Sequence, residues 1–179
     1  MTYADAENGV QGQAAIFDGA SGVVLPSGLI KTRDYSISLW MKPSELNRHT
    51  TAFFGARTDA NWISLLPRGN EEVPVDLTLW SNNGGNWYNA RTAVATSIDT
   101  WTHVALTVHN GELKLYVNGE EKYSGTDFPD LFTTSNGTFS LGVNYWDTPF
   151  KGMLDELRVY EGVLTAAEVE ELAAQETQE

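Results

Sequence analysis

The chain has 179 residues, which suits one domain, residues 1–179, with a sizeable core. Its formal charge of −13, from 24 acidic and 11 basic residues, argues against nucleic acid or anionic lipid as partner, because both need a basic surface. The absence of cysteine excludes disulfides and thiol catalysis. No apolar run approaches the roughly 20 residues that a membrane helix needs, so we expect no membrane insertion.

The first third of the chain shows a frayed start followed by strand patterns. Residues 1–13 are small and polar and are expected to be flexible or to begin outside a sheet. Ala14–Leu25 predicts strand, turn and strand, since Asp18-Gly19 is a turn signal. In Ser36–Lys42 apolar and polar residues alternate, which is typical of a half-buried strand.

The middle of the chain repeats this strand pattern with short polar connections. Further strands are expected over 51–56, 62–66, 75–80, 87–95, 102–108, 112–118, 121–123 and 137–143. Over 75–80 the alternation turns Val75, Leu77 and Leu79 toward the core. Trp80 falls on the opposite parity and should project outward.

The C-terminal part predicts one more strand and a helix. Lys151–Glu161 is rich in β-favouring residues, and Asp155 in its middle needs hydrogen bonds or a cation if it is buried. Thr165 and Glu168 have the spacing of a capping box, which predicts a short helix. About a dozen short strands with Gly and Asn turns therefore predict an all-β, two-sheet antiparallel jelly-roll sandwich with a short C-terminal helix.

Four stretches of sequence, in this order and spacing, resemble a known family. They read AAIFDGASGVVL, SISLWMKP, WTHVALTVHNGELKLYVNGE and SLGVNYW followed by FKGMLDELRVYEGVLTAAEVEEL. From about Ala14 to Leu172 the chain resembles the laminin-G-like, concanavalin A-like jelly-roll domains. Such domains often serve as carbohydrate-binding modules beside glycosidases and also occur in bacterial adhesins.

The resemblance bears on where the domain works. Residues 1–12 carry no secretory signal, so the chain is either cytoplasmic or cut from a larger secreted protein. The resemblance implies the second: a secreted or cell-surface setting, with the domain tethered to others in a longer chain. We expect it to act as a monomer and to bind a polysaccharide or oligosaccharide without catalysing a reaction.

The resemblance also implies a structural calcium ion (Ca²⁺). Laminarinase-type relatives hold one with an Asp of a similar last strand and carbonyl groups near the N-terminus. Asp155 matches that Asp, and Asp18 and Gly19 of the FDG turn are the expected partners. Calcium takes carboxylate and carbonyl oxygens in flexible geometry. The alternative is that Asp155 accepts backbone N–H bonds and needs no metal.

The aromatic residues predict a sugar site. The chain has six Trp and seven Tyr, more than a small core needs, and exposed aromatic clusters mark binding surfaces. The predicted site, on one face or its loop rim, comprises Arg57, Asn61, Trp62, Trp80, Trp87, Tyr88, Arg91, Asn144, Tyr145 and Trp146. Core packing is the alternative for each aromatic. Trp40 and Trp101 match structural aromatics of similar domains and are expected to pack.

Two other functions stay open. A polysaccharide-degrading enzyme needs a positioned acid–base pair, but the E-x-D-x-x-E arrangement of laminarinase-type relatives is missing, and the three histidines are scattered. We therefore predict no catalytic residues. A calcium-dependent adhesion or protein-interaction module is the other possibility. Its contacts would come from the acidic loop residues Asp59, Asp127, Asp130 and Asp147.

Overall fold

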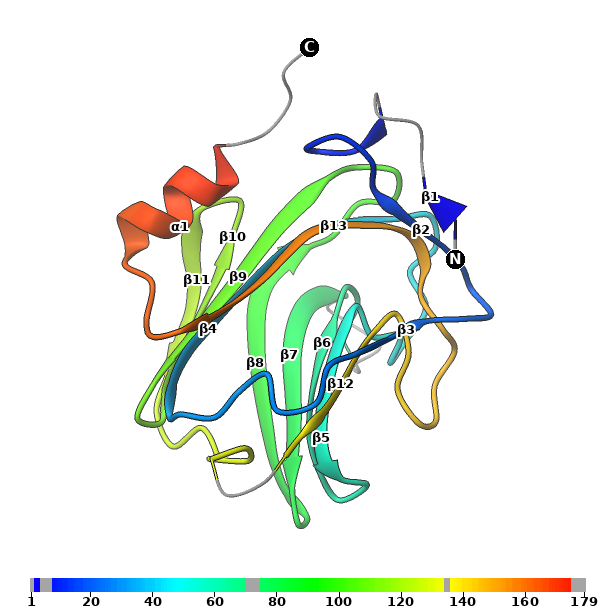
Figure 1. Cartoon of the computed structure of the whole chain (residues 1–179). Coiled ribbons are helices and arrows are strands. Elements are labelled where there is room, and N and C mark those ends of the chain that lie inside the picture. Colours follow the sequence, from blue (N-terminus) through cyan, green and yellow to red (C-terminus); the bar gives the residue numbers. More distant parts are fainter. Residues whose placement is uncertain (1, 4–7, 70–74, 134–135, 175–179) are drawn as a thin grey trace.

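The computed structural model describes residues 2–3, 8–69, 75–133 and 136–174. Its strands are β1 (Thr2–Tyr3), β2 (Ala15–Asp18), β3 (Val23–Leu25), β4 (Asp34–Pro43), β5 (Phe53–Thr58), β6 (Asn61–Leu66), β7 (Asp76–Asn83), β8 (Asn86–Ala95), β9 (Thr102–His109), β10 (Glu112–Val117), β11 (Glu120–Gly125), β12 (Thr138–Leu141) and β13 (Lys151–Glu161). They form two antiparallel sheets (Figure 1). The seven-stranded sheet has the order β1-β2-β13-β4-β9-β10-β11, and the six-stranded sheet has the order β3-β12-β5-β6-β7-β8. This confirms the predicted two-sheet jelly-roll sandwich.

One large apolar cluster fills the space between the sheets. The strand β4 contributes Ile37 and Leu39, and β6 contributes Ile63 and Leu65, all of which are buried. Because successive side chains of a strand point to opposite faces, the residues between these point out of the sandwich. The core therefore fixes which side chains each sheet presents on its outer face.

A short helix, α1 (Ala166–Ala173), covers part of the outer face of the seven-stranded sheet and contacts β9 and β11 (Figure 1). Val169 of the helix forms a small buried cluster with Ala105 and Tyr116. The Thr165 hydroxyl accepts a bond from the Glu168 N–H, and the Glu168 carboxylate accepts one from the Thr165 N–H, which confirms the capping box. Within the described parts of the chain, no helix has the length and apolar character needed to span a membrane.

The same outer face buries Trp40 and His103, whose ring centroids lie 5.1 Å apart. The Oγ of Ser38 lies 2.8 Å from Nε2 of His103. Burial lowers the pKa of His103 to about 4, so the ring is neutral at pH 7. Trp101 is half-buried, with Nζ of Lys42 at 6.0 Å from its ring centroid. Trp40 is thus a packing residue of this sheet, and Trp101, which directly precedes β9, lies beside Lys42 of β4.

Two local features differ from the expectation. Thr2 pairs with Ile16 across β1 and β2, so the N-terminal segment takes part in a sheet, and residues 4–7 of that segment lie outside the described residues. The strand β7 begins one residue later than predicted, and Val75, which precedes it, is 40% exposed. The expected inward position of Val75 is therefore wrong, whereas Leu77 and Leu79 are fully buried as predicted.

Candidate functional site

Strand alternation places a row of aromatic side chains on the outer face of the six-stranded sheet, the face that points away from its partner sheet. Ile63 and Leu79 point into the core, so their neighbours Trp62 of β6 and Trp80 of β7 point outward. Trp87 of β8 pairs with Asn82, which shares the parity of Trp80, and therefore joins the same face. The predicted outward position of Trp80 is borne out.

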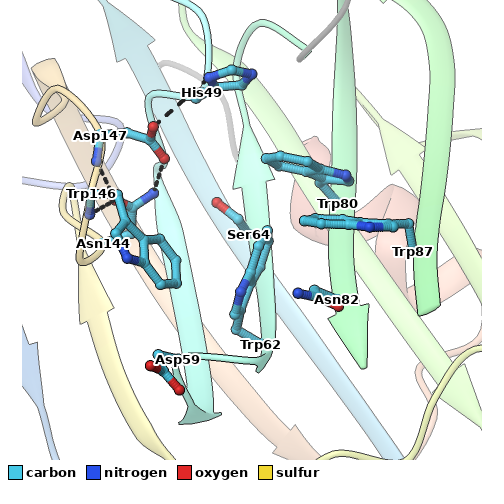
Figure 2. A pocket seen from close by; sticks show the side chains of 10 residues that line it. All are labelled: His49, Asp59, Trp62, Ser64, Trp80, Asn82, Trp87, Asn144, Trp146 and Asp147. Atoms are coloured by element: carbon cyan, nitrogen blue, oxygen red, sulfur yellow. Dashed lines mark hydrogen bonds and ion pairs between the residues drawn. The ribbon is translucent and has the colours of Figure 1, made fainter. Parts of the chain in front are cut away.

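The indole rings contact one another on this face. Trp62 lies edge-on to Trp80 and to Trp87, with centroid distances of 5.1 and 5.8 Å. Trp80 and Trp87 stack in parallel, with centroids 5.0 Å apart. Trp146, from the loop that follows β12, reaches Trp62 at 5.7 Å from the other side. Figure 2 shows Trp62 in the middle, between Trp146 and the Trp80–Trp87 pair.

These rings surround a hollow of about 240 Å³, which we call the first hollow. Trp62 is only 5% exposed, whereas Trp87 and Trp146 are 57% and 54% exposed. Trp62 is therefore a fixed floor, and the other two are walls open to solvent. The first hollow is lined by His49, Asp59, Trp62, Ser64, Trp80, Asn82, Trp87, Asn144, Trp146 and Asp147 (Figure 2).

Polar contacts hold the loop that carries Trp146. The side-chain oxygen of Asn144 accepts bonds from the N–H groups of Trp146 and Asp147, at 2.9 and 2.8 Å. Its amide nitrogen donates to Oδ2 of Asp147 at 2.7 Å. Asn144 thus acts mainly by fixing the wall of the hollow, which orders Trp146 before any ligand arrives.

His49 closes the upper rim of the first hollow in Figure 2. Its ring stacks on Trp80 with centroids 5.4 Å apart, and its Nδ1 lies 3.8 Å from Oδ1 of Asp147. Two carboxylates, Asp59 and Asp147, line the hollow, and among the described residues no lysine or arginine does. The hollow therefore offers aromatic faces, acceptors for hydroxyl groups and an acidic field.

The structure brings together five of the ten residues predicted for the sugar site. They are Trp62, Trp80, Trp87, Asn144 and Trp146. Tyr145 lies next to them, edge-on to Trp146 with centroids 5.2 Å apart.

The other four predicted residues do not line the first hollow. Arg91 forms an ion pair with the buried Asp76, and Asn61 bonds to the side chains of Thr58 and Asn83. Tyr88 has the opposite parity on β8, so it packs against the core, and its hydroxyl bonds to that of Tyr123. Arg57 is exposed at an irregularity of β5.

The remaining lining residues are not among those that the sequence predicted for a sugar site. Ser64 and Asn82 share the parity of Trp62 and Trp80, so strand alternation alone was sufficient to place them on this face. His49 carried no such signal, because a loop brings it to the rim. The two aspartates had been considered only for protein adhesion.

The residues predicted to share a calcium ion lie apart. Asp18 pairs with Lys151 across β2 and β13, and Asp155 lies four residues further along β13, about 13 Å at the rise of a strand. The Asp18 carboxylate accepts a hydrogen bond from the N–H of Ala20 and others from the same turn, which contains Gly19. These bonds lower the pKa of Asp18. Asp18, Gly19 and Asp155 therefore do not fit one shared ion.

The Asp155 carboxylate has protein donors on both oxygens. Oδ2 accepts bonds from the N–H groups of Val10 and Gln11, at 2.7 and 3.2 Å, and Oδ1 accepts one from Glu156 at 2.9 Å. Across the described residues no cluster of three or more His, Asp or Glu side chains is placed to hold a metal. An ion at Asp155 would depend on lone pairs left beside these bonds and on carbonyl oxygens.

Calcium binding by Asp155, which the sequence predicted together with Asp18 and Gly19, stays a prediction. If it occurs, adding Ca²⁺ to chelated protein at about 100 times its Kd should raise Tm by about 5–10 °C, because the ion binds only the folded state. Differential scanning calorimetry checks this, with Asp155→Asn as the variant that should lose the response. Equal Tm values in Ca²⁺ and in EDTA would remove the prediction.

Comparisons with known proteins agree with this architecture. A family model described as the concanavalin A-like lectin/glucanases superfamily matches residues 17–170. Domain 4 of AbnA, a GH43 extracellular arabinanase from Geobacillus stearothermophilus, solved in complex with arabinotriose, is 50% identical with a TM-score of 0.90, over 96% of this chain and 80% of that one.

More distant matches include a solved structure, which shares the fold alone, and a curated sequence. CBM40 of the Ruminococcus gnavus IT-sialidase, bound to alpha2,3 sialyllactose, is 16% identical with a TM-score of 0.64, over 89% of this chain and 95% of that one. Adhesion G-protein coupled receptor V1 of Danio rerio is 22% identical over 152 aligned residues, and the match covers 78% of this chain but 2% of the receptor. Since the family model spans most of the chain, from Phe17 to Glu170, the chain belongs to the concanavalin A-like lectin/glucanases superfamily, as the sequence resemblance had indicated.

Proposed function

We propose that this domain is a non-catalytic carbohydrate-binding module that holds a neutral polysaccharide in the first hollow. One observation carries the proposal: four tryptophans meet on an open sheet face around one hollow, outside the core. Soluble domains rarely expose such an aromatic cluster unless it binds something.

The geometry of the rings suits a sugar. A pyranose or furanose ring presents apolar C–H groups on one face, and an exposed indole offers a flat apolar surface of similar size. The walls Trp87 and Trp146 are more than half exposed, while Trp62 supports both from below. Because the rings already pack on one another, little side-chain entropy is lost when a ligand is bound.

The polar groups of the first hollow favour a neutral ligand. Hydroxyl groups donate to carboxylates, and Asp59 and Asp147 provide such acceptors beside the rings. A uronic acid or a sulfated sugar would bring a negative charge toward these groups and toward a chain of net charge −13. Like charges brought together in this way oppose binding.

The relative that is 50% identical suggests the first ligand to try. That domain was solved with arabinotriose and belongs to an extracellular arabinanase. We therefore propose arabinan or arabino-oligosaccharides as ligands here, and an accessory role beside other domains of a longer secreted or cell-surface protein.

The test is retention on an immobilised polysaccharide. The protein should be retarded in affinity electrophoresis through arabinan and not through polygalacturonate, and the glycan should be recovered uncleaved. Trp146→Ala and Trp80→Ala should each weaken binding about 30-fold or more, as expected for aromatic anchors of a binding site. Trp101→Ala, on the other sheet, is the matched control and should bind like the native chain.

Two results would contradict the proposal. Native migration of Trp146→Ala, with its Tm unchanged, would show that the first hollow is not the binding site. Failure of the native protein to bind any neutral polysaccharide would reject carbohydrate binding itself.

A further inference from the structure

A second hollow, also of about 240 Å³, lies on the same outer face, beyond the loop that carries Trp146. Its walls come from β3, β12 and β5 and from that loop, whereas the first hollow lies mainly over β6, β7 and β8. Its lining residues include Val24, Phe54, Thr138, Asn144 and Tyr145.

The two hollows adjoin each other across the loop that carries Tyr145 and Trp146. Asn144 lines both of them. Phe54, which is 2% exposed, supports the dividing loop through edge-on contacts with Tyr145 and Trp146, at centroid distances of 5.2 and 6.2 Å. Trp146 forms a wall of the first hollow and Tyr145 a wall of the second. The same loop therefore provides one wall for each hollow.

The chemistry of the second hollow resembles that of the first without its acids. Val24 and Tyr145 are 84% and 55% exposed and supply apolar surface. The Tyr145 hydroxyl lies 3.1 Å from Oγ1 of Thr138, so two hydroxyl groups that can donate or accept stand together at the wall. Among the described residues no charged side chain lines this hollow, which suits a neutral hydroxylated ligand.

We propose that the second hollow binds the continuation of the same glycan chain, so that the domain recognises a stretch of several sugar units. Adjacent strands are spaced about 4.8 Å apart, so the centres of the hollows, two to three strands apart, are separated by roughly 10–14 Å. A single sugar ring cannot span that separation, but an oligosaccharide can. This inference rests on the proposed function of the first hollow.

Isothermal titration with arabinobiose and successively longer arabino-oligosaccharides tests the inference. Affinity of the native protein should rise with chain length until both hollows are filled. Val24→Asp should cancel most of that rise, lowering affinity for the longest ligand about tenfold, because it removes apolar contact from the second hollow. Its affinity for arabinobiose, which is too short to reach both hollows, should not change.

Two further variants make the result specific. Ile98→Asp changes another aliphatic residue, 53% exposed and in neither hollow, and should bind every ligand like the native protein. Tyr145→Phe keeps the ring but removes the hydroxyl, and should weaken only the longer ligands.

The outcomes separate the two proposals. If arabinobiose binds but affinity does not grow with length, or if Val24→Asp matches Ile98→Asp for every ligand, the second hollow plays no part and the first stands alone. If the native protein binds no oligosaccharide of any length, the proposed function fails and this inference fails with it.

Discussion

Arg91→Ala is expected to lower the free energy of unfolding by about 3–5 kcal/mol, because it leaves a buried carboxylate without its cation. The side chain of Asp76 is 3% exposed, and its Oδ1 lies 3.1 Å from a terminal guanidinium nitrogen of Arg91. Nε of Arg91 adds contacts of 3.3 Å to both carboxylate oxygens. Without Arg91, the N–H of Ala93 is, among the described residues, the one other donor to that carboxylate, at 3.1 Å.

The Arg91 side chain is itself 35% exposed, so water can enter the space it leaves, and the loss should fall near the lower end of the range. Urea unfolding followed by tryptophan fluorescence measures it. Arg91→Lys should lose about half as much, because lysine keeps the charge but not the planar fork of donors. A loss below about 1 kcal/mol for Arg91→Ala would show that the ion pair does not stabilise the fold.

The same variant separates two roles for Arg91. The sequence suggested that it binds sugar, whereas the structure gives it a structural partner. Arg91→Ala, assayed well below its Tm, should therefore bind arabinan as tightly as the native protein. Reduced binding with unchanged stability would show that Arg91 contacts the ligand instead.

The alternation of apolar and polar residues along the strands was enough to predict the fold and the side of the sheet on which the tryptophans lie. Ile63 and Leu65, or Leu77 and Leu79, must point into one core, so Trp62 and Trp80 have to point out of it. The two-residue period is strict, and the burial of many apolar residues holds it in place. That is why the outward tryptophans could be predicted before their partners were known.

Some residues were wrongly predicted for the sugar site because they lie near tryptophans in the sequence. Such proximity shows neither which face of the sheet a side chain is on nor which residues it contacts in the fold. Tyr88 was grouped with its neighbour Trp87, although adjacent residues of a strand face opposite sides. Arg91 does share the parity of Trp87, but the buried Asp76 pairs with it. This ion pair depends on the register between β7 and β8, which cannot be predicted from the alternation within one strand.

Loops limited the prediction in a different way. His49 reaches Trp80 from the connection between β4 and β5, where its backbone has a positive φ of 63°. No local sequence pattern predicted this conformation. The spacing of Asp18 and Asp155 depends on the register of β2 against β13, which places Lys151 opposite Asp18. The sequence resemblance identified Asp18 and Asp155 as candidate calcium ligands, but it gave no distance between them.

Trp62→Ala is the second large effect, and it should reduce both stability and binding. Trp62 is 5% exposed and forms a cluster with Phe54 and Ala56, with Trp80 packed against it, on the outer face of the sheet. Truncating a buried aromatic side chain to alanine costs about 3–5 kcal/mol. Trp80, Trp87 and Trp146 all contact this one ring, so its loss frees three walls of the first hollow together.

Binding should therefore fall as far as in Trp146→Ala, although Trp62 itself is almost inaccessible to a ligand. Trp62→Phe keeps an aromatic floor and should lose less of both properties, which makes it the control if Trp62→Ala unfolds. Urea unfolding and titration with arabinotriose give the two quantities on the same samples. Native affinity in a destabilised Trp62 variant would mean that the walls hold their positions unaided, and the first hollow would then owe its shape to the Asn144 loop and to β7–β8 pairing rather than to the central indole.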